Sequence, residues 1–166
     1  LQGVQVVLKQ RFLRHLGASL GYSVHVIDSY QWRGQAVRSS YIRQLLSQEG
    51  AVRQAADYLG RPYRIWGRVG KGAGRGRTLG YPTANVGVPE GRLIPAFGVY
   101  ACWAWLGDRG YPAAVSIGIR PTFDSGDVLV EAHLLDFGES LYGQIMGLSF
   151  VERLRPEMRF AGAEAL

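Results

Sequence analysis

The chain has 166 residues, of which 47% are hydrophobic and 19% are charged, and it contains one cysteine. This composition is typical of a folded globular protein and excludes a disordered tail. No apolar run approaches the ~20 residues that a membrane-spanning helix needs, and the N-terminus lacks a signal-peptide pattern. The single Cys102 excludes an intramolecular disulfide. We therefore expect a cytoplasmic protein that is not attached to a membrane.

The formal net charge is +6, and arginine supplies almost all of the positive charge. A basic protein of this kind suits a polyanionic partner: nucleotide phosphates, nucleic acid or an anionic membrane surface. It is equally compatible with a soluble basic protein that has no such partner. Charge by itself does not choose among these alternatives.

The first 60 residues alternate helix and strand patterns. Residues 12–20 place four apolar side chains on one helical face, and "YSVHVI" at 22–27 follows as a strand pattern. Ser39 and Ser40 are candidate N-caps for a helix through "YIRQLL", which a glycine ends. Residues 51–60 carry apolar side chains at i, i+3, i+4 and i+7 and predict one more helix. This part of the chain therefore reads as α/β or helical material.

After Arg61-Pro62 the pattern changes to short strands joined by turns that are rich in glycine and aspartate. Such a succession predicts an antiparallel barrel or sandwich. We therefore predict two parts, an α/β segment over 1–60 and a mainly β domain over 61–166. The expected strands cover residues 63–69, 97–106, 111–119, 128–135 and 145–154.

A glycine-rich stretch, "GKGAGRGRTLGYPTAN", occupies residues 70–85. It fits neither the P-loop pattern nor the GxGxxG fingerprint. Glycine still allows successive backbone N–H groups to converge on one anion, and Arg75 and Arg77 can add charge-assisted contacts. A solvated hairpin is an equally good interpretation of the run alone, and an arginine-glycine contact with nucleic acid is another. The stretch is therefore a candidate phosphate site.

Thr83 and Asn85 follow this stretch two residues apart. In extended backbone, such residues point to the same side. A hydroxyl and an amide carbonyl would then face one point beside the phosphate candidate. These neutral oxygens suit Mg²⁺, which takes most of its charge compensation from substrate phosphates. A capped turn is the common alternative explanation of a lone T-x-N.

A carboxylate lies in the middle of the predicted strand "VLVEAHLLDF". Alternation places Glu131 on one face with His133 and on the opposite side from Val130 and Ala132. A carboxylate among apolar neighbours is costly to bury without a partner. The alternatives are a catalytic role, an ion pair with an arginine, or exposure on the outer face of a barrel. We expect His133 to support structure or to orient a neighbour.

Ordered motifs across residues 61–160 resemble the riboflavin kinase domain of bacterial bifunctional riboflavin kinase/FAD synthetases. The matching pieces are "LGRPY", "GRVGKGAGRGRTLGYPTAN", "FGVYA", "SIGIRPTF", "VEAHLLDF", "LYGQ" and "LRPEMRF". The resemblance implies a Greek-key, split-barrel-like antiparallel β-barrel. It also implies Mg²⁺-dependent transfer of the γ-phosphate of ATP to the 5′-hydroxyl of riboflavin, giving ADP and FMN.

The resemblance further implies roles for particular residues. Glu131 matches the catalytic base, and Thr83 and Asn85 match the Mg²⁺ ligands. Arg155 matches a residue on the flavin side, where Pro156 replaces the usual acidic residue. The residues expected to bind the nucleotide are Gly72, Arg75, Gly76, Arg77, Gly80, Tyr81, Thr83 and Asn85. The resemblance says nothing about the oligomeric state.

The sequence departs from the family pattern in several places. Residues 1–60 resemble only the tail of an adenylyltransferase domain and lack its HxGH motif, so we expect no adenylylation of FMN to FAD. Either the chain is a fragment of a bifunctional enzyme, or its N-terminal part has degenerated into a structural appendage. Ser116 stands where bacterial members often have Asn, and the chain stops before a helix that encloses the flavin.

Two other functions remain open at this stage. One is a non-catalytic remnant that still binds a flavin or a nucleotide. The other, which the motifs make the less favoured, is a basic barrel that binds nucleic acid through the arginine-glycine run and through Trp66 and Trp103.

Overall fold

A computed structural model describes residues 2–23, 25, 30–70, 82–119 and 128–158 of the chain, with side chains from residue 11 onward. The chain divides into two compact units, Leu1–Val37 and Arg38–Leu166. No helix in these described ranges is long and apolar enough to cross a membrane.

The first unit contains helix α1, Gln2–Ser19, and a two-stranded hairpin of β1, Gln31–Trp32, and β2, Gln35–Ala36. The predicted helix over 12–20 is thus the end of a longer helix. The hairpin turn needs positive φ at both central residues, and Arg33 and Gly34 have φ of 49° and 78°. Of the strand predicted over 22–27, the described residues are not in a strand, and the remainder lies outside the described ranges.

The second unit begins with three helical segments: α2, Ser39–Gln44, the π-helix η1, Leu45–Glu49, and α3, Val52–Leu59. Arg38 is the N-cap of α2 and no side chain caps this helix, so the predicted cap by Ser39 or Ser40 is wrong. The hydroxyl of a cap must lie before the first helical residue, whereas both serines are already helical. The helical ends at Gly50 and Gly60 are confirmed, since these glycines have φ of 65° and 68°.

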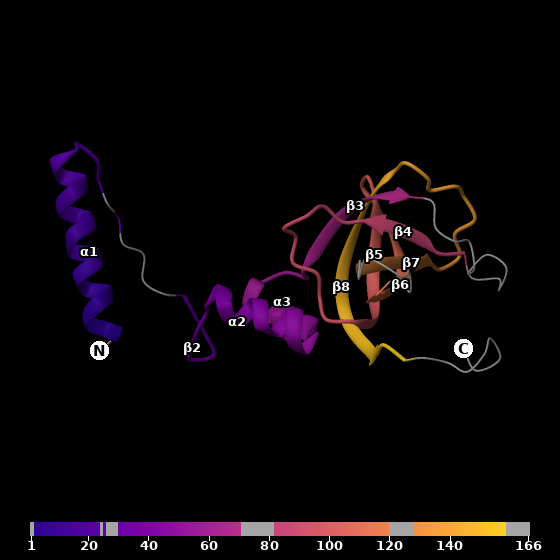
Figure 1. Cartoon of the computed structure of the whole chain (residues 1–166), viewed down its shortest axis with the longest axis horizontal. Coiled ribbons are helices and arrows are strands. Elements are labelled where there is room, and N and C mark those ends of the chain that lie inside the picture. Colours follow the sequence, from indigo (N-terminus) through magenta and orange to yellow (C-terminus); the bar gives the residue numbers. More distant parts are fainter. Residues whose placement is uncertain (1, 24, 26–29, 71–81, 120–127, 159–166) are drawn as a thin grey trace. The chain divides into compact units, whose positions relative to one another are not determined.

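Six strands form a closed antiparallel barrel, which confirms the predicted fold class (Figure 1). The order around the barrel is β3-β4-β7-β6-β5-β8, so β4 lies beside β7 and not beside β5. The strands are β3, Arg64–Gly70; β4, Ala84–Gly87; β5, Gly98–Leu106; β6, Arg109–Ile119; β7, Val128–Leu134; and β8, Ile145–Pro156. Closure leaves no open sheet edge in the barrel.

Alternation along each strand separates the barrel core from its outer wall. On β7, the side chains of Val130, Ala132 and Leu134 are only 2%, 1% and 4% exposed, whereas Glu131 and His133 are half-buried. The inward side chains form one apolar cluster with residues from the helices. Because successive residues of a strand point to opposite faces, Glu131 and His133 must lie on the outer wall.

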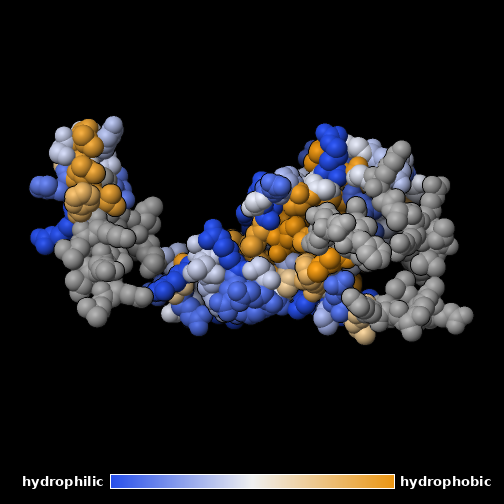
Figure 2. Space-filling model, in the orientation of Figure 1, coloured by the Kyte–Doolittle hydropathy of each residue, from blue (hydrophilic) through white to orange (hydrophobic). Residues whose placement is uncertain are grey.

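The helices pack onto the barrel through apolar and polar contacts. Leu45, Leu46 and Val52 are at most 1% exposed and belong to the same core cluster as the strands. The Arg153 guanidinium on β8 donates hydrogen bonds to the carbonyl oxygens of Glu49, at 2.9 Å, and of Phe97, at 2.6 Å. Figure 2 shows that α2 and α3 present a mostly hydrophilic face to solvent, as expected for helices whose apolar side faces the barrel.

The compact units divide at Val37, whereas the sequence pattern changes from helical to strand-like near residue 61. Residues 38–60 therefore have a helical sequence pattern but pack as part of the barrel unit.

The packing of this segment on the barrel leaves no room for a side chain at position 50. A Cβ atom at this position would lie 2.7 Å from Tyr100 Oη and 2.8 Å from Arg153 Cδ.

Candidate active site

Strand β4 lies between β3 and β7 and joins two parts of the predicted site. Asn85 stands directly opposite Glu131 of β7 and, on the other side, opposite Gly70 of β3. Directly opposed residues project to the same face with their Cβ atoms about 4.5–5.5 Å apart. The structure therefore brings the predicted metal ligand Asn85 next to the predicted base Glu131.

Thr83, the residue before β4, joins the same group. Its hydroxyl Oγ1 lies 3.5 Å from Glu131 Oε1, which is the outer limit for a hydrogen bond. Thr83 is exposed, and Asn85 and Glu131 are half-buried. The three oxygen-bearing side chains are thus open to solvent and to a ligand on the outer wall of the barrel.

Strand β6 flanks Glu131 on the side away from β4. Ser116 stands directly opposite Glu131 and, further round the barrel, opposite Val99 of β5, which in turn pairs with Arg155 of β8. These residues make one outward row across the wall. With strands about 4.8 Å apart, the three steps from Glu131 to Arg155 cover about 14 Å of surface. Arg155 therefore does not touch Glu131 but lies at the far end of the same row.

His133 lies two residues after Glu131 on the same outward face of β7. Its Nδ1 atom is 2.9 Å from the carbonyl oxygen of Pro82. A carbonyl oxygen only accepts hydrogen bonds, so Nδ1 carries the hydrogen in this contact. His133 thus contacts the backbone immediately before Thr83.

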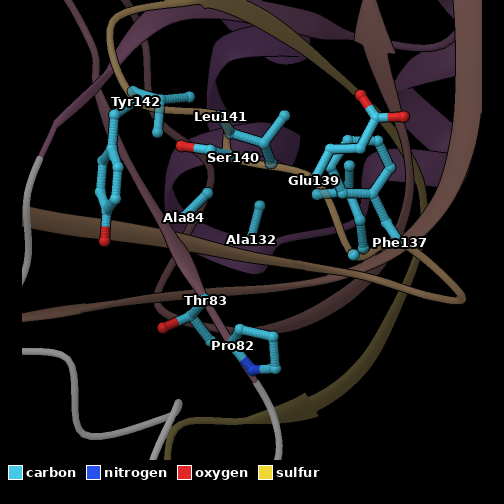
Figure 3. Close-up of a pocket in the computed structure, with 12 residues that line it drawn as sticks. Pro82, Thr83, Ala84, Ala132, Phe137, Glu139, Ser140, Leu141 and Tyr142 are labelled. Atoms are coloured by element: carbon cyan, nitrogen blue, oxygen red, sulfur yellow. The ribbon is translucent and has the colours of Figure 1, made fainter.

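A cavity of about 280 Å³ opens where β4 begins and β7 ends (Figure 3). Figure 3 shows the rings of Tyr142 and Phe137 at two sides of this cavity, with the methyl groups of Ala84 and Ala132 between them. The full lining is Val69, Pro82, Thr83, Ala84, Ala132, Leu134, Phe137, Gly138, Glu139, Ser140, Leu141 and Tyr142. Thr83 belongs both to this cavity and to the oxygen cluster, by which we mean the side chains of Thr83, Asn85 and Glu131 on the outer wall.

Sequence reasoning named neither Ser116 nor the segment 137–142 as part of the site. The motifs "SIGIRPTF" and "LYGQ" contain Ser116 and residues 141–144, and they were the signal that could have found them. The register between β6 and β7 places Ser116, and the path of the connection after β7 places residues 137–142. Neither can be derived from the spacing of residues in the sequence.

Other predicted nucleotide-binding residues lie outside the described ranges: Gly72, Arg75, Gly76, Arg77, Gly80 and Tyr81. The residues that flank this stretch are described and belong to the site. Gly70 pairs with Asn85 in the sheet, and Pro82 accepts the hydrogen bond from His133. The expectation that the stretch holds phosphates stays a prediction.

The oxygen cluster fits a metal ion that takes some of its ligands from the protein and the others from a substrate. Within the described part of the chain, no three His, Cys, Asp or Glu side chains lie close enough to hold a metal ion by themselves. Thr83 Oγ1 and the Asn85 amide carbonyl are neutral hard donors next to one carboxylate. Mg²⁺ accepts such a partial set and completes its shell with phosphate oxygens and water.

Comparison with known proteins defines the class to which this barrel and site belong. Residues 59–166 match the protein family described as "Flavokinase: Riboflavin kinase". The chain belongs to the riboflavin kinase family, which confirms the resemblance in the sequence motifs. Riboflavin kinases carry out ATP-dependent phosphoryl transfer, a reaction that generally requires a divalent metal.

Individual relatives are bifunctional proteins about twice as long. The chain is 38% identical over 162 residues to the bifunctional riboflavin kinase/FMN adenylyltransferase of Pseudomonas fluorescens, covering 93% of this chain and 50% of that protein. It is 37% identical over 144 residues to the protein of the same name from Bacillus subtilis, covering 85% and 45%. The chain therefore spans about half the length of these relatives.

A solved structure shares the fold. It is described as the crystal structure of a macrolide-efflux protein from Streptococcus pneumoniae, and it superposes with a TM-score of 0.80 at 30% sequence identity. The match covers 90% of this chain and 49% of that one.

Proposed function

We propose that this chain transfers the γ-phosphoryl group of ATP to the 5′-hydroxyl of riboflavin and releases ADP and FMN. The observation that carries the proposal is the direct cross-strand pairing of Asn85 with Glu131, with Thr83 in contact, in a chain of the riboflavin kinase family. The residues that would hold a phosphate-binding metal would then lie beside a proton acceptor. Phosphoryl transfer asks mainly for this kind of positioning.

The cavity beside Thr83 suits the nucleoside part of ATP. Its volume of about 280 Å³ and its walls of aromatic and small apolar side chains resemble an ordinary small-ligand pocket. A purine between Phe137 and Tyr142 would direct its phosphates past Thr83 to the outer wall. In this pose the γ-phosphate would lie between the cavity and Glu131.

Thr83 and Asn85 would hold the metal ion, and we propose Mg²⁺. When bound, the ion neutralises charge on the β- and γ-phosphate oxygens. The hydroxyl and amide oxygens are neutral ligands, so they leave the positive charge of the ion to be compensated by the phosphates of the nucleotide.

Glu131 would act as the general base. As the 5′-oxygen of riboflavin forms its bond to the γ-phosphorus, the bond from phosphorus to the bridging oxygen of ADP breaks, and the hydroxyl proton passes to the Glu131 carboxylate. The alternation of β7 places this carboxylate on the outer wall, where Thr83 contacts it and Ser116 stands opposite it on β6. The flavin would extend along the row toward Arg155, whose cationic side chain suits a polar edge of the ring system.

The experiment is incubation of the chain with ATP, Mg²⁺ and riboflavin, followed by chromatography of the flavins. FMN formation in step with ADP production, and dependence of both on riboflavin, would support the proposal. Binding of riboflavin or ADP without FMN would indicate a non-catalytic remnant and would refute it.

The nucleic-acid alternative relied on exposed aromatic side chains, and one of these, Trp66, has contacts within the barrel wall. Trp66 lies flat over Gly147, where a Cβ atom would come within 2.6 Å of the indole ring. The Arg64 guanidinium lies between this ring, at 5.5 Å, and that of Trp105, at 4.8 Å. Trp66 and Trp103 are still 39% and 45% exposed. The match to the riboflavin kinase family is therefore our reason for proposing phosphoryl transfer and not nucleic-acid binding.

A further inference from the structure

The backbone pairing between β4 and β7 is short. Its register contains two pairs, Ala84 with Ala132 and Asn85 with Glu131, and it stops before Thr83. The preceding residue, Pro82, has no N–H group and cannot donate to a ladder. Among the described residues, the ladder between β4 and β7 therefore does not extend to Pro82 and Thr83.

Two outward side chains of β7 contact these two residues. Glu131 Oε1 lies 3.5 Å from the hydroxyl of Thr83, and His133 Nδ1–H donates a 2.9 Å hydrogen bond to the carbonyl of Pro82. Consecutive residues ahead of β4 are thus tied to alternate residues of β7. The His133 contact is the shorter of the two and acts on backbone, so it restrains the direction in which the chain enters β4.

We propose that His133 is a positioning residue of the phosphoryl transfer: its Nδ1–H fixes the Pro82 carbonyl and thereby sets Thr83 and Asn85 opposite Glu131. The inference rests on the proposed function, because Thr83 and Asn85 must hold the metal–nucleotide complex for their position to matter. The rate of a reaction falls steeply when the reacting groups are displaced by about an ångström. His133 itself touches neither the metal nor the transferred group in this assignment.

The test uses the different reach of two amide side chains. In His133→Asn the amide nitrogen stands near the position of Nδ1 and keeps a donor there. In His133→Gln the amide nitrogen stands near Nε2, and in His133→Leu there is no donor. His15→Leu, on the exposed surface of α1, is the matched control. Thermal unfolding of every variant shows whether the fold is kept.

The first measurement is backbone hydrogen exchange of the peptide covering residues 82–88 in the ligand-free protein. Loss of one hydrogen bond should raise exchange there about five- to tenfold in the Leu and Gln variants, and Asn should stay within about twofold of the parent. The second measurement is steady-state kinetics. The same variants should lose about tenfold in kcat/KM for ATP, with the dissociation constant of riboflavin unchanged.

Each outcome decides the matter. Parent-like exchange and kinetics in His133→Leu would overturn the inference, as would rescue by Gln and not by Asn. Faster exchange with unchanged kinetics would show that His133 merely supports the strand, which would also overturn it. Absence of FMN from the parent protein would refute the proposed function. The positioning role of His133 would then be refuted as well, because there would be no reaction for it to assist. The hydrogen-exchange data would still show, independently, whether His133 restrains the start of β4.

Discussion

Replacing Glu131 with glutamine is the sharpest perturbation of the proposed chemistry. The amide has nearly the same shape and can keep the long contact to Thr83, but it cannot accept the hydroxyl proton. A positioned general base contributes roughly 10²–10⁴-fold, so kcat should fall by that factor, equivalent to about 3–5 kcal/mol of transition-state stabilisation. Because Glu131 is half-buried and its contact with Thr83 is 3.5 Å long, the free energy of unfolding should change by less than about 0.5 kcal/mol.

The assay follows FMN by chromatography at saturating ATP, with calorimetric titration of Mg²⁺–ADP to show that nucleotide binding is intact. Glu90→Gln, a substitution at an exposed position outside the site, is the matched control and should behave like the parent. Parental turnover in the Glu131→Gln variant would show that the carboxylate is not the base.

Three other predictions concern single side chains. Asn85→Ala should weaken the Mg²⁺-dependent affinity for ADP about tenfold by calorimetry, through loss of one metal ligand, and should leave Mg²⁺-free binding unchanged. Arg153→Met removes two charge-assisted hydrogen bonds, to the carbonyl oxygens of Glu49 and Phe97, and should lower the urea-derived unfolding free energy by about 2–4 kcal/mol; parental stability would show that these hydrogen bonds do not stabilise the fold. Burial raises the pKa of the Cys102 thiol, so iodoacetamide at pH 8 should label it only as fast as the protein unfolds. Because the unfolded thiol ionises first, the stability it contributes is complete below about pH 8.5 and falls as pH rises, which alkaline urea titrations would detect.

The strands were the most predictable part of the fold because they are half-buried. Alternation of apolar and polar residues over 63–69 and 128–135 anticipated β3 at Arg64–Gly70 and β7 at Val128–Leu134 within one residue. The same reasoning failed over 22–27, where Tyr22 and Ser23 belong to no strand. An alternating pattern marks a strand only where a partner strand is available, and that is a property of the tertiary fold.

The candidate site was predictable in its parts and not in its assembly. The i, i+2 spacing placed Thr83 and Asn85 on one side, and alternation placed Glu131 and His133 on one face. Their meeting depends on β4 pairing with β7, a contact in which Thr83 and Glu131 are 48 residues apart in the sequence. No local pattern encodes such a register. The cavity was missed for the same reason, since one of its walls is the connection after β7.

The packing of residues 38–60 onto the barrel has a practical consequence for protein engineering. A truncated domain that starts at residue 61 would uncover the barrel surface under Leu45, Leu46 and Val52 and leave the Arg153 guanidinium without its Glu49 acceptor. We expect such a fragment to aggregate on expression. A fragment that starts at Arg38 keeps both contacts, and it is therefore the better choice for labelling, crystallisation or fusion to another enzyme.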